Sequence, residues 1–109
     1  MVNQGDIVKI NYNPQKGHEQ AGYRPAVIIS NKLINIKTSL AFLCPITHIN
    51  CKNPFHYELK HYDFVDGFVM CDQVKTMDLN AGDYKVIGTL SDADISEIIT
   101  RVEMLIEKE

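Results

Sequence analysis

Arg24 is the residue of this chain with the clearest chemical potential. The sequence holds two arginines, Arg24 and Arg101. Arg24 lies between a polar, glycine-flanked stretch, residues 17–22, and a run of small and apolar residues, 25–30. A guanidinium presents a rigid fork of N–H donors that fits phosphate or carboxylate oxygens. The sequence therefore predicts a phosphate-binding group held at one defined point, at the entrance to a strand.

A second polar pair follows another apolar run. Residues 40–46 favour a buried strand whose far end delivers Thr47 and His48. A threonine hydroxyl can donate a hydrogen bond or position a reacting group, and histidine titrates near neutrality and can act as a general acid or base. The alternatives are a plain strand-end hydroxyl for Thr47 and an ordinary surface histidine for His48.

Short strands separated by polar turns account for most of the chain. Alternating polar and apolar residues predict a half-buried strand over 6–12, and the run 25–30 predicts a strand buried on both faces that begins at Pro25. The remaining predicted strands span residues 40–46, 55–59, 67–71 and 84–90. This pattern favours a small, strongly bent barrel.

Three features modify that pattern. Pro45 implies an edge or a bulge in its strand. Residues 72–78 are too polar for a core strand, and their end favours a short helical turn. Ser91 is the expected N-cap of the one good helix, with acidic residues in its first turn. The helix carries an apolar stripe that should lie on the barrel or on a partner: Ile95, Ile98, Ile99, Val102, Leu105 and Ile106.

Composition indicates one compact cytoplasmic domain. The chain has 109 residues, of which 45% are hydrophobic and 23% charged. It shows neither a signal sequence nor an apolar run of the roughly 18 residues that span a bilayer. The formal net charge of −3 disfavours a protein that coats nucleic acid, so any nucleic-acid site must be local.

Metal and nucleotide chemistry lack support in the sequence. The three cysteines form no CxxC pair, and Cys44 and Cys71 lie in apolar runs that favour burial as reduced thiols. The histidines follow no zinc-finger or helical i, i+4 spacing. Phosphate-cradling GxxxxGK, dinucleotide-binding GxGxxG and esterase GxSxG motifs are missing from the sequence. We therefore expect neither a metal nor a cofactor.

Several short motifs occur in order along the chain: residues 5–8 (GDIV), Pro14, residues 17–26 (GHEQAGYRPA), residues 45–47 (PIT) and residues 72–78 (DQVKTMD). Together they resemble the MazF/PemK family of bacterial toxin ribonucleases, from about Gly5 to the C-terminal helix. Their combination in this order is specific.

The resemblance implies a single toxin domain over residues 1–109. Its expected fold is mainly β with a C-terminal α-helix, a small SH3-like barrel of the MazF/CcdB type. It implies a metal-independent, sequence-specific endoribonuclease that cleaves single-stranded mRNA through 2′-hydroxyl attack, leaving 2′,3′-cyclic phosphate and 5′-hydroxyl ends. It also implies a homodimer and a cognate MazE-like antitoxin whose acidic tail occupies the RNA groove.

The family's functional positions fall on four residues. Arg24 and Thr47 match its catalytic arginine and threonine, whereas Glu19 and Gln73 match positions that contact RNA. Glu19 could also be a proton acceptor or orient Arg24. The alternatives are a structural salt bridge from Arg24 to an acid such as Glu19, and a Glu19 carboxylate that is merely solvated.

The chain departs from common family members at three positions. Asn11 and Asn13 replace residues that are often acidic, and His48 directly follows Thr47. These differences leave the base specificity open, and His48 offers a rival acid or base. A different class of function also stays open: a non-catalytic toxin that binds DNA gyrase, as in the CcdB family, which is thought to share the barrel.

Overall fold

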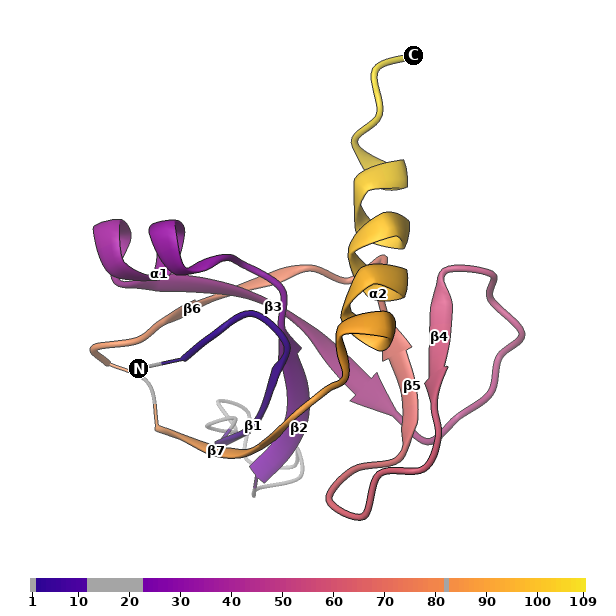
Figure 1. Cartoon of the computed structure of the whole chain (residues 1–109), viewed down its shortest axis with the longest axis horizontal. Helices are drawn as coiled ribbons and strands as arrows, with labels where there is room; N and C mark the ends of the chain where they lie inside the picture. The colour runs from indigo at the N-terminus through magenta and orange to yellow at the C-terminus, as the bar shows by residue number, and fades with distance from the viewer. Residues whose placement is uncertain (1, 12–22, 82) are drawn as a thin grey trace, which may run out of the picture.

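The structure is a computed structural model that describes residues 2–11, 23–81 and 83–109. Within these ranges the chain forms seven strands and two helices (Figure 1). The strands are β1 (Asp6–Asn11), β2 (Tyr23–Ile28), β3 (Leu40–Thr47), β4 (His56–Leu59), β5 (Gly67–Met70), β6 (Lys75–Asp78) and β7 (Tyr84–Thr89). The helices are α1 (Lys32–Thr38) and α2 (Asp92–Leu105). In this part of the chain, neither helix has the length and apolar character needed to cross a membrane.

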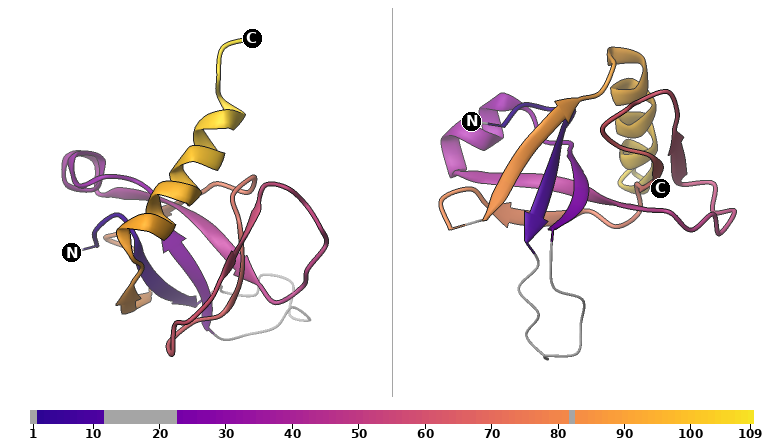
Figure 2. Two further views of the ribbon diagram at one scale, coloured as in Figure 1. Left: turned by 45° about the vertical axis from the view of Figure 1, so that its right-hand side comes forward. Right: turned by 90° about the horizontal axis from the view of Figure 1, so that it is seen from below.

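One antiparallel sheet connects all the strands, in the order β4-β5-β3-β2-β1-β7, with β6 pairing the first half of β3. The sheet bends strongly (Figure 2), and an irregular register between β1 and β7 at Ile7 and Val8 contributes a bulge. Among the described residues β4 and β7 form the two ends of this order, so the sheet is not closed. The predicted class, mainly β with a C-terminal helix, is confirmed.

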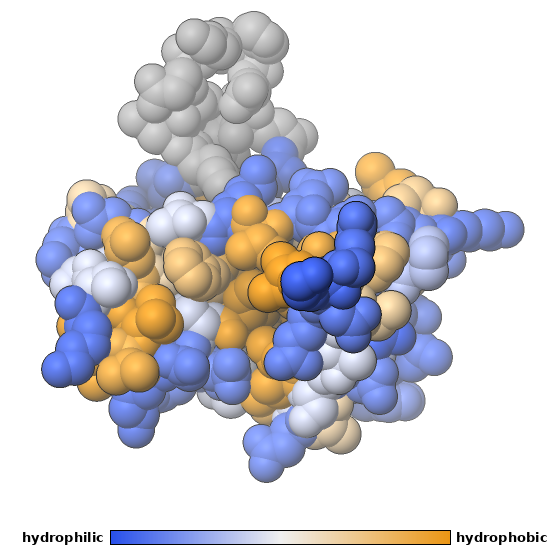
Figure 3. Space-filling model, turned by 90° about the horizontal axis from the view of Figure 1, so that it is seen from above, coloured by the Kyte–Doolittle hydropathy of each residue, from blue (hydrophilic) through white to orange (hydrophobic). Residues whose placement is uncertain are grey.

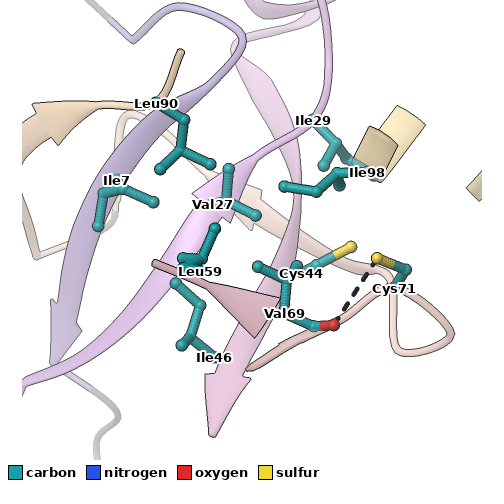
Figure 4. Packing of buried hydrophobic residues seen from close by; sticks show 10 residues of the cluster. All are labelled: Ile7, Val27, Ile29, Cys44, Ile46, Leu59, Val69, Cys71, Leu90 and Ile98. Carbon is teal, nitrogen blue, oxygen red and sulfur yellow. Dashed lines mark hydrogen bonds between the residues drawn. The ribbon is translucent and has the colours of Figure 1, made fainter. Parts of the chain in front are cut away.

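Apolar residues are buried on both faces of the central strands. Val27 and Cys44 belong to one core cluster, over which α2 places Ile98 (Figure 4), whereas Ala26 and Leu43 belong to a second cluster. Each fully buried aliphatic side chain contributes about 1.5 to 3 kcal/mol. The predicted burial of the second strand on both faces is therefore confirmed for its C-terminal half.

The predicted C-terminal helix is also confirmed. Ser91 is its N-cap and accepts a hydrogen bond from the backbone N–H of Asp94 at 3.2 Å. Ile98 is buried, but Leu105 and Ile106 are 41% and 81% exposed. The apolar stripe thus covers the sheet along the body of the helix and leaves the core at its end.

The prediction for residues 72–78 was wrong at its C-terminal end. Instead of a helical turn, Lys75–Asp78 forms β6, which pairs with Leu40–Leu43 of β3. The strand looks polar because Met77 is its one buried residue. Sheet pairing here outweighs a composition that is weak for a core strand.

The helix α1 was not predicted, since we expected a single helix. Asn31 caps it by accepting a hydrogen bond from the backbone N–H of Ile34 at 3.2 Å, and Ser39 ends it in the left-handed region with φ 59°. Its buried residue is polar Asn35, while Leu33 and Ile36 are exposed. The helix therefore lacks the inward apolar stripe that would have predicted it.

Pro25 and Pro45 are both placed differently from expectation. The strand β2 begins at Tyr23, so Pro25 lies within it, paired with Lys9 of β1, and the ladder to β3 begins at Ala26. Pro45 lies inside central β3 rather than at an edge. It stands where the partner changes from β6, paired through Leu43, to β5, paired from Ile46. A missing N–H is tolerated at such a break in the ladder.

Candidate active site

A cleft of about 600 Å³ lies where β2, β3, β5 and β6 approach one another. Its polar lining consists of Tyr23, Arg24, Thr47, His48, Gln73 and Lys75, and its apolar lining includes Pro25, Pro45 and Ile46. Two lining side chains are cationic, and none of those contributed by the described residues is acidic. The lining of the cleft is therefore locally positive, although the chain as a whole carries a net negative charge.

Strand register explains why Arg24 and Thr47 meet at this cleft. Ala26 pairs with Pro45 in the ladder between β2 and β3. The ladder ends at this pair, and the same register continued by two residues would bring Arg24 opposite Thr47. Because side chains alternate along strands, Arg24 shares a face with Ala26, and Thr47 shares a face with Leu43, and both of these belong to the second core cluster. The two predicted catalytic residues therefore line one cleft from neighbouring strands.

The position of Thr47 depends on a close backbone approach. Thr47 is half-buried, and its Oγ1 accepts a hydrogen bond from the backbone N–H of Ile49 at 3.2 Å. Gly67 of β5 has φ 115°, and a Cβ there would lie 2.5 Å from the Thr47 carbonyl oxygen. Glycine is needed at this point both for its conformation and for its lack of a side chain. The strand β5 thereby holds the end of β3 closely.

Gln73 and Lys75 bring a third segment to the cleft. The backbone N–H of Gln73 donates to the carbonyl of Met70 at 3.1 Å, which turns the chain between β5 and β6. Lys75 then pairs with Leu43 of β3. Gln73 was predicted to contact a ligand, but Lys75 was missed. The signal was present, because Lys75 is two residues beyond Gln73 in the same motif and a strand places such residues on one face.

His48 also lines the cleft, and its imidazole is engaged with a carboxylate. Nε2 of His48 lies 3.0 Å from Oδ1 of Asp66, and these side chains are 77% and 80% exposed. So exposed a pair is weak in water. This contact is what an ordinary surface histidine makes, and it requires no catalytic role for His48.

Tyr23 was not predicted as a site residue, and it ties the cleft to the start of β7. Its hydroxyl donates to Oδ1 of Asp83 at 2.9 Å, and the side-chain amide of Asn11 donates to Oδ2 of the same carboxylate at 3.2 Å. The hydrogen bond to Asp83 raises the pKa of Tyr23 above its usual 10.0. Asn11, one of the departures noted in the sequence, thus helps to fix this end of β1. Glu19 and Asn13 lie outside the described residues.

The family model for PemK-like, MazF-like toxins of type II toxin–antitoxin systems matches residues 3–106. The chain belongs to this family. It is 33% identical to the endoribonuclease toxin MazF of Escherichia coli (strain K12), over 94% of this chain and 91% of that protein. It is also 33% identical to the endoribonuclease toxin ChpB of the same strain, over 94% of this chain and 92% of the relative.

Solved structures of the family have the same fold. The MazE–MazF complex from Deinococcus radiodurans (Form-II) superposes with a TM-score of 0.87 at 28% identity, covering 99% of this chain and 97% of the solved chain. MazF from the same organism (Form-I) gives a TM-score of 0.81 at 28% identity, covering 98% and 97%. Family membership expected from the motifs is therefore confirmed, together with the MazF-type fold.

Proposed function

We propose that this protein is an endoribonuclease toxin that cleaves single-stranded RNA. The observation that carries the proposal is the cleft, which Arg24 and Thr47 line from neighbouring strands together with Gln73 and Lys75. The Escherichia coli relatives described above are named endoribonucleases, which supports the activity and disfavours gyrase binding. We infer a single toxin domain, supported by the family match over residues 3–106.

The proposed chemistry uses the nucleophile within RNA itself. The 2′-hydroxyl loses its proton and attacks the adjacent phosphorus, while the 5′-oxygen leaves and gains a proton. The products are a 2′,3′-cyclic phosphate and a 5′-hydroxyl, and no metal takes part. Negative charge grows on the non-bridging oxygens, where the Arg24 guanidinium can donate two charge-assisted hydrogen bonds and Thr47 can donate another.

Proton transfer calls for a group other than Arg24. A guanidinium, with a pKa above about 12, is a poor base near neutrality, so we assign Arg24 to stabilisation of the transition state. Glu19 is the proposed RNA-contacting residue that could also accept the proton or orient Arg24. Gln73 is proposed to read a base edge, since an amide both donates and accepts hydrogen bonds.

The partners follow from the same cleft. A cognate MazE-like antitoxin is proposed, supported by the MazE–MazF complex of the similar Deinococcus radiodurans protein. An acidic antitoxin segment would complement Arg24 and Lys75.

We also propose a homodimer that acts in the cytoplasm. Large apolar side chains that lie on the surface support self-association, among them Leu33, Ile36, Phe42 and Ile106, and Figure 3 shows apolar patches on one face.

Incubation with a long RNA transcript in EDTA tests this function. We expect cleavage at a restricted set of sequences, with 5′-hydroxyl and cyclic phosphate ends. An intact transcript, together with DNA gyrase stalled by the protein, would instead establish the gyrase-binding class. Cleavage that disappears in EDTA and returns with a divalent metal would overturn the metal-free chemistry.

A further inference from the structure

A second group of chemically active side chains, Cys51, His56 and Asp72, is not part of the cleft lining. Cys51 is exposed, and its Sγ is 3.4 Å from Nδ1 of His56. The other ring nitrogen, Nε2, lies 3.4 Å from Oδ1 of Asp72. A thiol, an imidazole and a carboxylate in this order form the arrangement of nucleophile, base and orienting group that activates cysteines.

The Asp72 carboxylate determines which nitrogen of the His56 imidazole carries the proton and which one meets the thiol. The negative charge of an ionised Asp72, 3.4 Å from Nε2, favours the tautomer of neutral His56 with its proton on Nε2. Nδ1 then presents a lone pair to Cys51, and the thiol is the donor of that contact. A proton can therefore pass directly from sulfur to nitrogen.

The arrangement is held in place by its surroundings. The His56 side chain is 7% exposed, against 31% for Asp72. Asn53 fixes both the loop and the carboxylate. Its side-chain amide donates to Oδ2 of Asp72 at 3.1 Å, and its backbone carbonyl accepts from the backbone N–H of His56 at 2.9 Å. The base and its orienting group are thus fixed, whereas the sulfur faces solvent.

The other two thiols lack these features. Cys44 and Cys71 are buried in the first core cluster. Burial raises the pKa of Cys44 to about 12 and that of Cys71 to about 11. Few thiolates form at such sites near neutrality, so both should react slowly with reagents in solution. Cys44 and Cys71 therefore serve as internal controls for the reactivity of Cys51.

We propose that Cys51 is a nucleophilic thiol-modification site that takes low-molecular-weight disulfides. His56 accepts the thiol proton on Nδ1, and the sulfur attacks one sulfur of the incoming disulfide. A mixed disulfide with Cys51 forms as the original S–S bond breaks, and the other half leaves as a thiolate. Asp72 is a positioning residue in this step. The site does not depend on the proposed ribonuclease activity.

The rate of reaction with dithio-bis-nitrobenzoate, whose leaving thiolate is coloured, tests the proposal on the folded protein at neutral pH. We expect one thiol to react about tenfold faster than glutathione under the same conditions. That fast phase should vanish in Cys51→Ser. A fast phase that survives in Cys51→Ser, or a Cys51 rate no higher than that of glutathione, would overturn the assignment.

Variants of the partners separate activation from simple exposure. His56→Gln should lower the Cys51 rate about tenfold. Because the His56 side chain is buried, the more exposed Asp72 provides a second route. Asp72→Ala should also slow the reaction, and Asp72→Asn should restore part of the rate because its amide oxygen keeps a partial negative charge beside Nε2. The matched control is Asp66→Asn, which removes the carboxylate beside the other histidine, His48, and should leave the rate unchanged. Wild-type rates in folded His56→Gln or Asp72→Ala would overturn the proposal.

Discussion

The cleft and the junction of α2 with the sheet each hold one of the two arginines of the chain. In the α2 junction, defined by Tyr57, Tyr62, Asp94 and Arg101, the guanidinium serves the protein itself. Nη1 of Arg101 donates to the carbonyl of Glu97 at 2.9 Å and to its carboxylate at 2.8 Å. Its Cζ also lies 4.8 Å from the centre of the Tyr57 ring.

Carboxylates are used differently in the two regions as well. Asp94 in the junction accepts hydrogen bonds from the hydroxyls of Tyr57 and Tyr62, which join α2 to the chain around β4. The cleft has no acidic lining residue among those described, and it presents cationic and amide groups to an open volume. Arg101 thus contacts groups of its own helix and the Tyr57 ring, whereas Arg24 lines an open volume in which we propose that it contacts RNA.

Arg24→Ala should give the largest effect. Loss of a donor aimed at developing charge typically costs about 100- to 1,000-fold in rate. Arg24 is exposed, so the free energy of unfolding should change by less than about 1 kcal/mol. Cleavage of a short RNA in EDTA and thermal unfolding measure the two quantities. A slow rate explained entirely by unfolded protein would remove Arg24 from the chemistry.

Arg101→Ala should show the opposite pattern. Loss of the stacking on Tyr57 and of the packed side-chain stem should lower the free energy of unfolding by about 2 kcal/mol. The cleavage rate per folded molecule should stay at the wild-type value. Arg101→Met is a useful control, since it keeps an apolar stem and removes an Nε that is buried without a hydrogen-bond partner among the described residues. It should lose less stability than the alanine variant.

Thr47→Ala should slow cleavage at least about tenfold, which corresponds to about 1.4 kcal/mol in the transition state. The hydroxyl is expected to contact the reacting phosphate, whereas its loss leaves the strand pairing of β3 intact. Thr47→Ser keeps the hydroxyl and should retain most of the rate. Equal rates for the alanine and serine variants would place the hydroxyl outside the chemistry.

Acid should weaken the α2 junction through Asp94. Burial would raise the pKa of Asp94, but hydrogen bonds from Tyr57, Tyr62 and Ser91 outweigh it and hold the pKa below its usual 3.8. The ionised form therefore stabilises the fold above that value, and this contribution, about 1 kcal/mol, is lost as pH falls through the lower folded pKa. Urea unfolding between neutral and acidic pH should show a shallower acid loss in Asp94→Asn. The same slope in both proteins would contradict the assignment.

His48→Gln should give the smallest change. The exposed imidazole is paired with Asp66, and we expect the cleavage rate to stay within about threefold of wild type, less than 1 kcal/mol. The pH dependence of the rate provides the readout. A loss comparable to that of Arg24→Ala would make His48 the general acid or base.

Secondary structure was easiest to predict where one buried face places apolar residues at regular intervals along the sequence. The strand around Ile7 and the helix after Ser91 followed directly from apolar spacing and a capping residue. The strand β6 and the helix α1 were not predicted from the sequence. Each buries a single residue, Met77 in β6 and Asn35 in α1, so no apolar pattern marks them. Their formation depends on pairing and capping that the spacing of apolar residues does not report.

The candidate site was predictable to the extent that strands and motifs determine it. Three of the predicted site residues, Arg24, Thr47 and Gln73, line the cleft. Lys75 was missed because its strand was missed. The prolines were misplaced because sequence alone does not reveal where Pro45 meets a gap between two partner strands. The roles of the site residues, including Glu19, remain predictions.

The most direct test compares Arg24→Ala with Arg101→Ala under one condition. Single-turnover cleavage of a short RNA is measured in EDTA, with each rate corrected for the folded fraction. The account predicts that the Arg101→Ala rate equals wild type and exceeds that of Arg24→Ala by about 100-fold or more. Equal corrected rates for the two variants would contradict the claim that the cleft arginine performs the chemistry.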